Sequence, residues 1–277
     1  MSTPVKLNTK NLKVLELLKR LSLEGARRLL VATLVLLFPL VLVRTFLNAL
    51  GCRVSSDAKV GFSWLFCRRL ELQGGSRVGH FNYFCVNRLS LGSSAKIGDL
   101  NIARGPFDIV LLDRAGIGNR NTFARAPLGV TYGHAQIQLG RDSKITAGHT
   151  IDCTATILFG DNSILAGKGS QVWTHGYVHR LNAGARYRVD GEVRIGDNVY
   201  LGSRVIITSG VVVLSGVIVG AGVILSKELN AVGMYVSAPL RMLARPSPPG
   251  SRSDLNRIEC PELAEEVYRK NSANKSR

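Results

Sequence analysis

The sequence has few aromatic residues and no pattern of paired cysteines. Aromatic residues make up 6 % of its 277 residues, and its five cysteines are scattered without any CxxC spacing. The number and spacing of these cysteines fit neither a disulfide framework nor a zinc site, and we expect a reducing compartment. A core must therefore rest on Val, Ile, Leu and Ala, while 29 glycines supply tight corners. The composition favours a β-solenoid over a helical bundle.

Acidic residues are also scarce. The chain has 19 Asp and Glu against 36 Lys and Arg, a formal net charge of +17. Such a charge suits a polyanionic partner: nucleic acid, anionic lipid or phosphorylated substrates. Residues 1–70 hold twelve Lys and Arg but only three acidic residues, beside the most apolar segment of the chain. This placement favours a membrane surface. No nucleic-acid motif and no interleaving of aromatic with basic residues is present, so we expect no nucleic-acid partner.

No apolar run reaches the length of a membrane-spanning helix. The uncharged run Leu29–Val43 is ended by Arg44, whereas a span needs about 20 residues. Residues 11–28 read as an amphipathic helix. A cleaved signal peptide fits poorly because so many residues precede the run. A single span would place the rest of the chain outside the cytoplasm. We favour an interfacial or re-entrant helical hairpin bent at Pro39.

Two series of aliphatic residues recur every six positions late in the chain. The first series is Ile195, Leu201, Ile207, Val213, Val219 and Leu225. The second lies four residues after each of these and consists of Val199, Val205, Val211, Val217, Val223 and Leu229. A period of six fits neither an α-helix nor a simple two-sided strand. It predicts a triangular coil of short strands, about 18 residues per coil, stacked as parallel sheets.

The same spacing continues upstream with breaks. It appears at Leu139, Ile145 and Ile151, and in shifted phase at Phe159 and Leu165. We therefore predict an N-terminal membrane-associating arm at 1–51, a solenoid at 52–238 and a tail at 239–277. The tail is expected to contain a short helix over Pro261–Lys270, which begins with proline. The arm and this helix are expected to cap the open ends of the solenoid.

Residues 172–192, VWTHGYVHRLNAGARYRVDGE, interrupt the repeat. The segment is polar and lies between two well-formed runs of the six-residue pattern. An insertion at a corner of a solenoid projects from one face as a loop, and loops of this size are often functional. Its histidine, aromatic and arginine content predicts a functional loop.

Four stretches, WTHGYVH, VRIGDNVYLGSRVIITSGV, VIVGAGVILSKEL and YVSAPLRMLAR, follow one another between residues 173 and 245. In order and spacing they resemble the hexapeptide-repeat acyltransferases, a family of left-handed parallel β-helices that includes galactoside, maltose and streptogramin acetyltransferases. The resemblance implies a CoA-dependent O-acyltransferase that uses acetyl-CoA as co-substrate and needs no metal. It covers about 70 residues in detail.

The resemblance also implies roles for individual residues. His175 matches the general base, and a neutral imidazole suits the removal of a proton from a hydroxyl. Gly202 and Ser203 match the backbone corner that meets the oxyanion. Trp173 and His179 are possible acceptor-binding residues. The positions matching CoA contacts are Ser203, Ala221, Ser226, Lys227 and Arg241, with Arg245 as a further candidate. The family's closing Gly-x-Pro-Ala-Lys reads here Ser237-Ala238-Pro239-Leu240-Arg241, which keeps the charge.

A carboxylate that orients His175 is expected among Asp152, Asp161 and Asp190, and spacing does not choose between them. The family further implies a homotrimer in which His175 of one chain faces CoA-binding residues of another. The basic arm leading into LGCRVSSDAKVG resembles members that modify bacterial surface polysaccharides or their lipid-linked precursors. We therefore expect a sugar hydroxyl as acceptor and a location on the cytoplasmic face of the inner membrane.

Two other functions are compatible with a solenoid. A zinc enzyme would need three histidines to converge from His80, His134, His149, His175 and His179. A non-catalytic membrane-associated scaffold would need only the solenoid and the arm. Substitution of His175 separates the scaffold from the enzyme.

Overall fold

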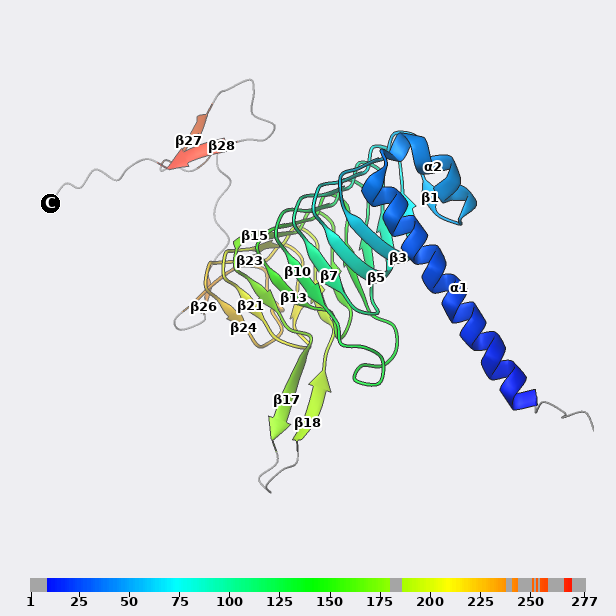
Figure 1. Ribbon diagram of the computed structural model, residues 1–277. Helices are drawn as coiled ribbons and strands as arrows, with labels where there is room; N and C mark the ends of the chain where they lie inside the picture. The colour runs from blue at the N-terminus through cyan, green and yellow to red at the C-terminus, as the bar shows by residue number, and fades with distance from the viewer. Residues whose placement is uncertain are drawn as a thin grey trace, which may run out of the picture.

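The protein folds as a parallel β-solenoid with two helices at its N-terminal end (Figure 1). The structure, a computed structural model, describes residues 9–179, 186–237, 241–243, 251, 253, 255–258 and 267–270. Three faces, here called A, B and C, form the walls of the coil, and the chain visits them in the order B, C, A. The mainly β fold predicted from the six-residue pattern is confirmed; the left-handed sense of the coil stays a prediction.

Face A and part of face C belong to one sheet, because two long strands bend over the corner between them. Face A contains β1 (Arg53–Val54), the second halves of β3 (Trp64–Leu72) and β5 (Tyr83–Leu91), β8 (Asp108–Leu111), β11 (Gln136–Leu139), β14 (Ile157–Phe159), β19 (Val193–Ile195) and β22 (Val212–Val213). Face C contains the first halves of β3 and β5, then β7 (Ile102–Arg104), β10 (Thr122–Ala124), β13 (Thr150–Asp152), β16 (Gln171–Val172), β21 (Ile206–Ile207) and β24 (Ile224–Leu225).

Face B is a separate sheet. It contains β2 (Lys59–Val60), β4 (Arg77–Val78), β6 (Lys96–Ile97), β9 (Gly116–Ile117), β12 (Lys144–Ala147), β15 (Ile164–Lys168), β20 (Tyr200–Leu201), β23 (Ile218–Val219), β25 (Met234–Val236) and β26 (Arg241–Leu243). All these pairings are parallel except that of β26 with β25, which is antiparallel. The segment after residue 238 thus adds a strand to the solenoid sheet.

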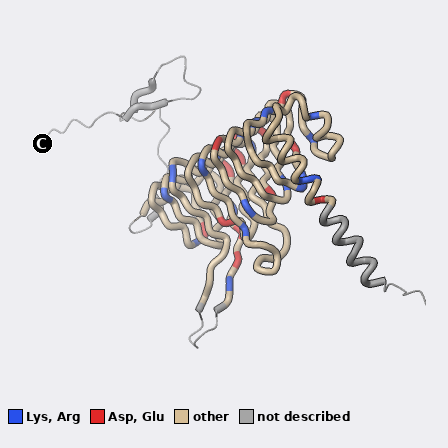
Figure 2. The backbone as a smooth tube through the Cα atoms, in the orientation of Figure 1, with Lys and Arg blue, Asp and Glu red and all other residues tan. Residues whose placement is uncertain are grey.

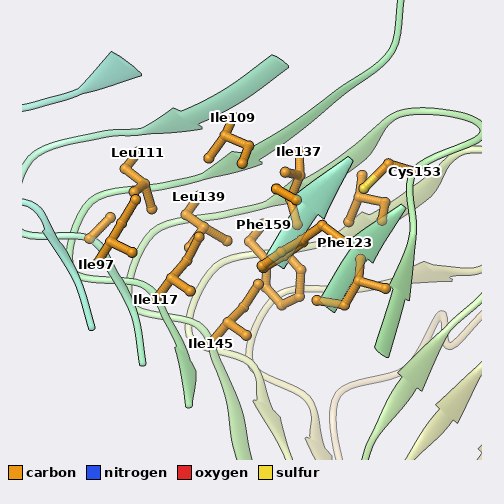
Figure 3. Close-up of a cluster of buried hydrophobic side chains, with 14 of the residues drawn as sticks. Ile97, Ile109, Leu111, Ile117, Phe123, Ile137, Leu139, Ile145, Cys153 and Phe159 are labelled. Carbon is orange, nitrogen blue, oxygen red and sulfur yellow. The ribbon is translucent and has the colours of Figure 1, made fainter. Parts of the chain in front are cut away.

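The six-residue pattern places its aliphatic residues inside. All twelve members of the two series are buried, none more than 3 % exposed. The first series visits faces A, B and C in turn, and equivalent residues of successive coils stack in register, as Phe159, Ile195 and Val213 do. Figure 3 shows the same stacking in earlier coils, where Leu111 lies next to Leu139. Burial of each such side chain contributes roughly 1.5–3 kcal/mol, so the stack is the main source of stability.

A buried polar ladder runs along the corner between faces B and C. The side-chain oxygen of Asn82 accepts from the backbone N–H (2.9 Å) and the amide (3.0 Å) of Asn101, which in turn accepts from Asn121. The next step is His149, whose Nδ1 accepts from the backbone N–H of Ser170. Since that nitrogen is an acceptor, the ring is neutral, and burial lowers the pKa of His149 to about 4. The ladder satisfies backbone groups that the corner leaves without strand partners.

The N-terminal helices cap the solenoid. Helix α1 (Thr9–Leu37) and helix α2 (Leu40–Ala49) meet at Pro39, whose extended backbone starts α2. The predicted bend at Pro39 is confirmed, since proline cannot continue a helix without losing a hydrogen bond. Leu40, Val43 and Leu47 of α2 are buried in the same core as the solenoid interior. This covers the open end, as predicted for the arm.

Helix α1 is fastened to the solenoid by arginine. The Arg28 guanidinium lies 4.1 Å from the Phe66 ring centroid and donates to the carbonyl of Phe66 (3.1 Å). Arg27 donates to the carbonyl of Leu50 (2.9 Å). Two basic residues of the arm, Arg27 and Arg28, therefore bind groups within the protein itself. Within the described residues, neither helix is both long and apolar enough to cross a membrane.

The C-terminal segment differs from the prediction. Residues 267–270 form strand β28 (Val267–Lys270), which pairs antiparallel with β27 (Leu255–Ile258). The predicted helix over Pro261–Lys270 is therefore wrong at its C-terminal end, and residues 261–266 lie outside the described residues. The strand is favoured because Val267 and Tyr268 have strong β-propensity and pair with Ile258 and Arg257.

Candidate active site

The interruption of the repeat at residues 172–192 is a β-hairpin that projects from the corner between faces C and A (Figure 1). Its strands are β17 (His175–His179) and β18 (Arg186–Asp190). Val172 itself belongs to the solenoid, where it is buried. In the antiparallel register His175 lies opposite Asp190, and Tyr177 lies opposite Arg188. Since opposite residues share a face of a hairpin, these four side chains lie on one face.

His175 is held at the root of the hairpin by a carboxylate of the solenoid. Its Nδ1 lies 2.8 Å from Oδ2 of Asp152, the last residue of β13. The His175 side chain is 26 % exposed, and that of Asp152 is 9 % exposed. One nitrogen of the ring is therefore bound inside the protein, while part of the ring reaches the surface.

Asp152 is built to stay ionised. Its Oδ2 also accepts from the backbone N–H (2.9 Å) and the hydroxyl (2.7 Å) of Thr174, and its Oδ1 accepts from the Thr154 hydroxyl (2.8 Å). Burial alone would raise the pKa of Asp152, but the hydrogen bonds from Thr174, His175 and Thr154 outweigh it, so the pKa lies below its usual value. A carboxylate that accepts the proton on Nδ1 leaves Nε2 of His175 as the basic nitrogen.

The other two carboxylates that the sequence left open are engaged elsewhere. Asp161 lies at the corner after β14, where it accepts from the backbone N–H of Arg141 (2.7 Å). Asp190 pairs with Arg188, with 2.6 and 2.8 Å between guanidinium nitrogens and carboxylate oxygens. Asp152 is thus the partner of His175. An alignment of successive coils could have identified Asp152 from the sequence, because Ile151 pairs with Val172 and Asp152 therefore lies beside the root of the hairpin.

Aromatic rings surround the imidazole. The ring centroids of Trp173 and Tyr177 lie 6.4 Å and 5.8 Å from that of His175, both edge-on. Trp173 donates its indole N–H to Gln171 (2.9 Å) and is partly exposed. His179 lies farther out on β17, opposite Arg186. The structure therefore places Trp173 beside His175 and His179 away from the root of the hairpin.

Gly202 and Ser203 lie at the other edge of face C. They follow β20, where the chain enters face C, whereas His175 follows β16, where the chain leaves it. The Gly202 N–H already donates to the carbonyl of Val219 (2.9 Å), and the role of this corner toward an oxyanion stays a prediction. Within the described part of the chain the Ser203 N–H has no acceptor. One chain therefore does not bring His175 and the Ser203 corner together.

The residues that match CoA contacts lie in three places. Some lie at each of the two edges of face C, and Arg241 lies on face B. Ala221 lies one coil beyond Ser203, on the same corner, and both reach the surface. Ser226 and Lys227 are exposed and follow β24, which lies two coils beyond the root of the hairpin. Arg241 begins β26 on face B, in register with Val236. Arg245 lies outside the described residues.

No metal site is present in the part of the chain that the structure describes, where no three His, Cys, Asp or Glu residues gather closely enough to hold an ion. His134 pairs with Asp108 on the surface (3.1 Å), and His149 is buried in the polar ladder. The donor set for zinc catalysis therefore does not form within one described chain.

Among known protein families, one matches a part of the repeat. Residues 192–227 match the family model described as the hexapeptide repeat of succinyl-transferase. The matched residues run from the start of β19 to just beyond β24, where the six-residue pattern is unbroken. No curated protein is significantly similar in sequence to this chain.

Several solved structures resemble this chain. The polysialic acid O-acetyltransferase OatWY is 18 % identical, with a TM-score of 0.47, over 70 % of this chain and 84 % of that one. The polySia-specific acetyltransferase NeuO is 20 % identical, with a TM-score of 0.37, over 64 % and 82 % of the two chains. A hexapeptide-repeat acetyltransferase from Vibrio cholerae O1 biovar eltor, solved with acetyl coenzyme A, is 14 % identical, with a TM-score of 0.34, over 82 % and 88 %.

Proposed function

We propose that the protein is a CoA-dependent O-acyltransferase that moves an acetyl group from acetyl-CoA to a sugar hydroxyl. The observation that carries the proposal is the pair His175–Asp152, because an ionised, buried carboxylate fixes the imidazole with its second nitrogen available as a base. The match to a hexapeptide repeat and the likeness to structures described as acetyltransferases agree with it.

The chemistry follows from this geometry. Nε2 of His175 takes the proton of the acceptor hydroxyl, and the oxygen attacks the thioester carbonyl. When the carbon–sulfur bond breaks, the proton on His175 passes to the leaving thiolate, giving an ester and free CoA. Asp152 stays ionised and stabilises the imidazolium that forms in between. The Ser203 N–H is the proposed donor to the transient oxyanion.

We further propose a homotrimer in which these groups meet across an interface. His175 and Ser203 lie at opposite edges of face C, so a site that uses both needs a neighbouring chain. The second face of the hairpin supports such contact. Its Val178, Tyr187 and Val189 side chains are exposed although apolar, as expected of residues that a neighbour covers.

The N-terminal end suits the cytoplasmic face of the inner membrane, and a lipid-linked or surface glycan as acceptor. The turn between α1 and α2 exposes apolar side chains, here called the elbow. They are Leu37, Phe38, Val41, Leu42 and Phe46, which are 49–78 % exposed. Basic residues lie at the same end of the molecule (Figure 2). The exposed ones are Arg53, Lys59, Arg68 and Arg69. An apolar tip with a basic rim suits an anionic bilayer surface.

One experiment tests the enzyme. Purified protein is incubated with acetyl-CoA and a membrane extract, and free CoA and esterified sugar are measured together. Wild type and the matched control His134→Ala are expected to transfer acetyl groups, and His175→Ala is expected to transfer none. Full transfer by His175→Ala would overturn the mechanism. Absence of transfer by wild type, with intact binding to membranes, would favour the non-catalytic scaffold.

Membrane attachment has its own test. Flotation with vesicles of phosphatidylglycerol and phosphatidylcholine is expected to carry wild type to the top of the gradient. Leu42→Asp is expected to abolish flotation while leaving the thermal midpoint unchanged, because the residue is 72 % exposed. Thr45→Asp, an exposed neighbour on α2, controls for added negative charge. Flotation of Leu42→Asp equal to that of wild type would exclude the elbow as the contact.

A further inference from the structure

A second insertion leaves the solenoid at the same corner as the hairpin. The chain departs after β10 at Ala124 and returns at β11 with Gln136, also between faces C and A (Figure 1). The segment 126–134 is here called the corner loop. Its sequence contains Pro127, Gly129 and Gly133 and has no repeat pattern. The sequence alone therefore assigns it no role.

Arg125 holds the corner loop from the buried side of the solenoid corner. The residue is 5 % exposed, and its guanidinium donates only to backbone carbonyls. The acceptors are Pro106 (2.7 Å), Tyr132 (2.7 Å), Gly133 (3.1 Å) and Thr154 (3.2 Å). Burying a charged guanidinium is costly unless its donors are used, so these bonds hold the loop in one conformation.

Arg188 fastens the corner loop from the side. Its Nη1 donates to the carbonyl of Val130 (2.6 Å), and its other nitrogens pair with Asp190. Arg188 lies on the face of the hairpin that carries His175 and Tyr177. The corner loop is therefore held against the catalytic face of the hairpin.

The same contacts reach the proposed base. Arg125 binds the carbonyl of Thr154, and the Thr154 hydroxyl donates to Asp152, which binds His175. Loop, carboxylate and base thus form one connected network of hydrogen bonds. In such a network the position of each member depends on its neighbours.

The corner loop presents apolar side chains outward although its backbone is fixed. Leu128, Val130 and Tyr132 are 56–73 % exposed, while Thr131 between them is buried and donates to the carbonyl of Ala126 (2.9 Å). A fixed backbone with exposed aromatic and aliphatic side chains can bind the apolar face of a sugar ring at little entropic cost.

We propose that the corner loop is the acceptor-binding wall of the active site and that Arg125 and Arg188 are positioning residues that hold it there. The proposal rests on the acyltransferase function. Tyr132 is the residue of the loop that stacks on the sugar acceptor, and the two arginines act through the loop and through Asp152.

The first test needs no activity. Hydrogen exchange is measured on the full chain for wild type, Arg125→Ala and Arg188→Gln. Backbone amides of the corner loop are expected to exchange at least about tenfold faster in both variants, since their anchors are gone. Arg104→Ala is the matched control, because Arg104 lies beside Ala124 in register but is exposed. Unchanged exchange in both arginine variants would overturn the positioning role, whether or not the protein proves to be an enzyme.

The second test separates binding from chemistry. With the acceptor extract of the wild-type assay, Tyr132→Ala is expected to raise KM for the acceptor about tenfold, with kcat and KM for acetyl-CoA unchanged, as loss of uniform binding requires. Arg188→Gln is expected to lower kcat as well, because it also loosens the hairpin. If Tyr132→Ala leaves the acceptor KM unchanged in an enzyme that depends on His175, the corner loop is not the acceptor wall. Since Tyr132 is exposed, Tyr132→Ala leaves the thermal midpoint unchanged.

Discussion

Asp152→Asn is the substitution that tests the catalytic pair most directly. Asparagine has nearly the same shape as aspartate and keeps one carbonyl oxygen as an acceptor. It loses the charge and places an N–H₂ donor where Oδ2 or Oδ1 accepts hydrogen bonds from Thr174, Thr154 and His175. If the amide faces His175, Nδ1 can no longer donate, and the proton moves to Nε2, the nitrogen that should act as the base.

The magnitude follows from these contacts. The loss of the correct tautomer and of a charge that stabilises the imidazolium is expected to lower kcat by about 10²–10⁴. The hydrogen bonds to an ionised carboxylate are expected to contribute about 1.5–3 kcal/mol each, so the variant is also expected to be less stable. The loss of stability is expected to be partial, because the carbonyl oxygen of asparagine still accepts one of these hydrogen bonds.

The assay measures release of free CoA with a thiol reagent, alongside urea unfolding. Asp161→Asn is the control, because Asp161 is a corner carboxylate away from His175. Because the pKa of Asp152 lies below its usual value in the folded protein, its contribution is present at neutral pH and is lost as pH falls through that lowered pKa. The stability difference between wild type and Asp152→Asn should shrink over that acidic range. A variant that keeps wild-type kcat would refute the role of the pair.

Three further perturbations test the fold and the corner of face C. The pKa of His149 is about 4 in the fold, below its unfolded value of about 6.5, so the unfolded state binds the proton first. The free energy of unfolding should fall by up to about 3 kcal/mol as pH drops through that window, and urea titrations of His149→Asn should lack this fall. Gly167→Ser places a Cβ 1.7 Å from the Ser203 Oγ at a backbone φ of +69°. It should cost about 1–2 kcal/mol and raise KM for acetyl-CoA, and an unchanged KM would separate this corner from CoA binding. Leu139→Ala should lower the free energy of unfolding by about 2–5 kcal/mol in a calorimetric scan, and a smaller loss would mean that the coil collapses around the cavity.

The burial of polar side chains at the corners could not be predicted from the sequence. The aliphatic series identified the inward positions because a strand residue points either into the coil or out of it. Nothing in the spacing shows that Asn82, Asn101 and Asn121 are stacked inside, since their burial depends on hydrogen bonds between neighbouring coils. The corner loop and Arg125 were missed for the same reason. Their partners lie about one coil away in sequence and become neighbours only on stacking.

The sequence by itself determined the solenoid, the interruption at residues 172–192 and the break at Pro39. Each of these follows from a local rule: the period of six, the loss of that period, and the missing N–H of proline. Tertiary structure decided which carboxylate meets His175, because Asp152 reaches it across coils through a hydrogen bond that spacing does not encode. It also decided that the Gly202 N–H donates to the carbonyl of Val219 in the next coil and that residues 267–270 pair as a strand. The first two depend on partners about one coil away in the chain, and the third depends on pairing between two neighbouring strands, which the local pattern of Pro261–Lys270 does not encode.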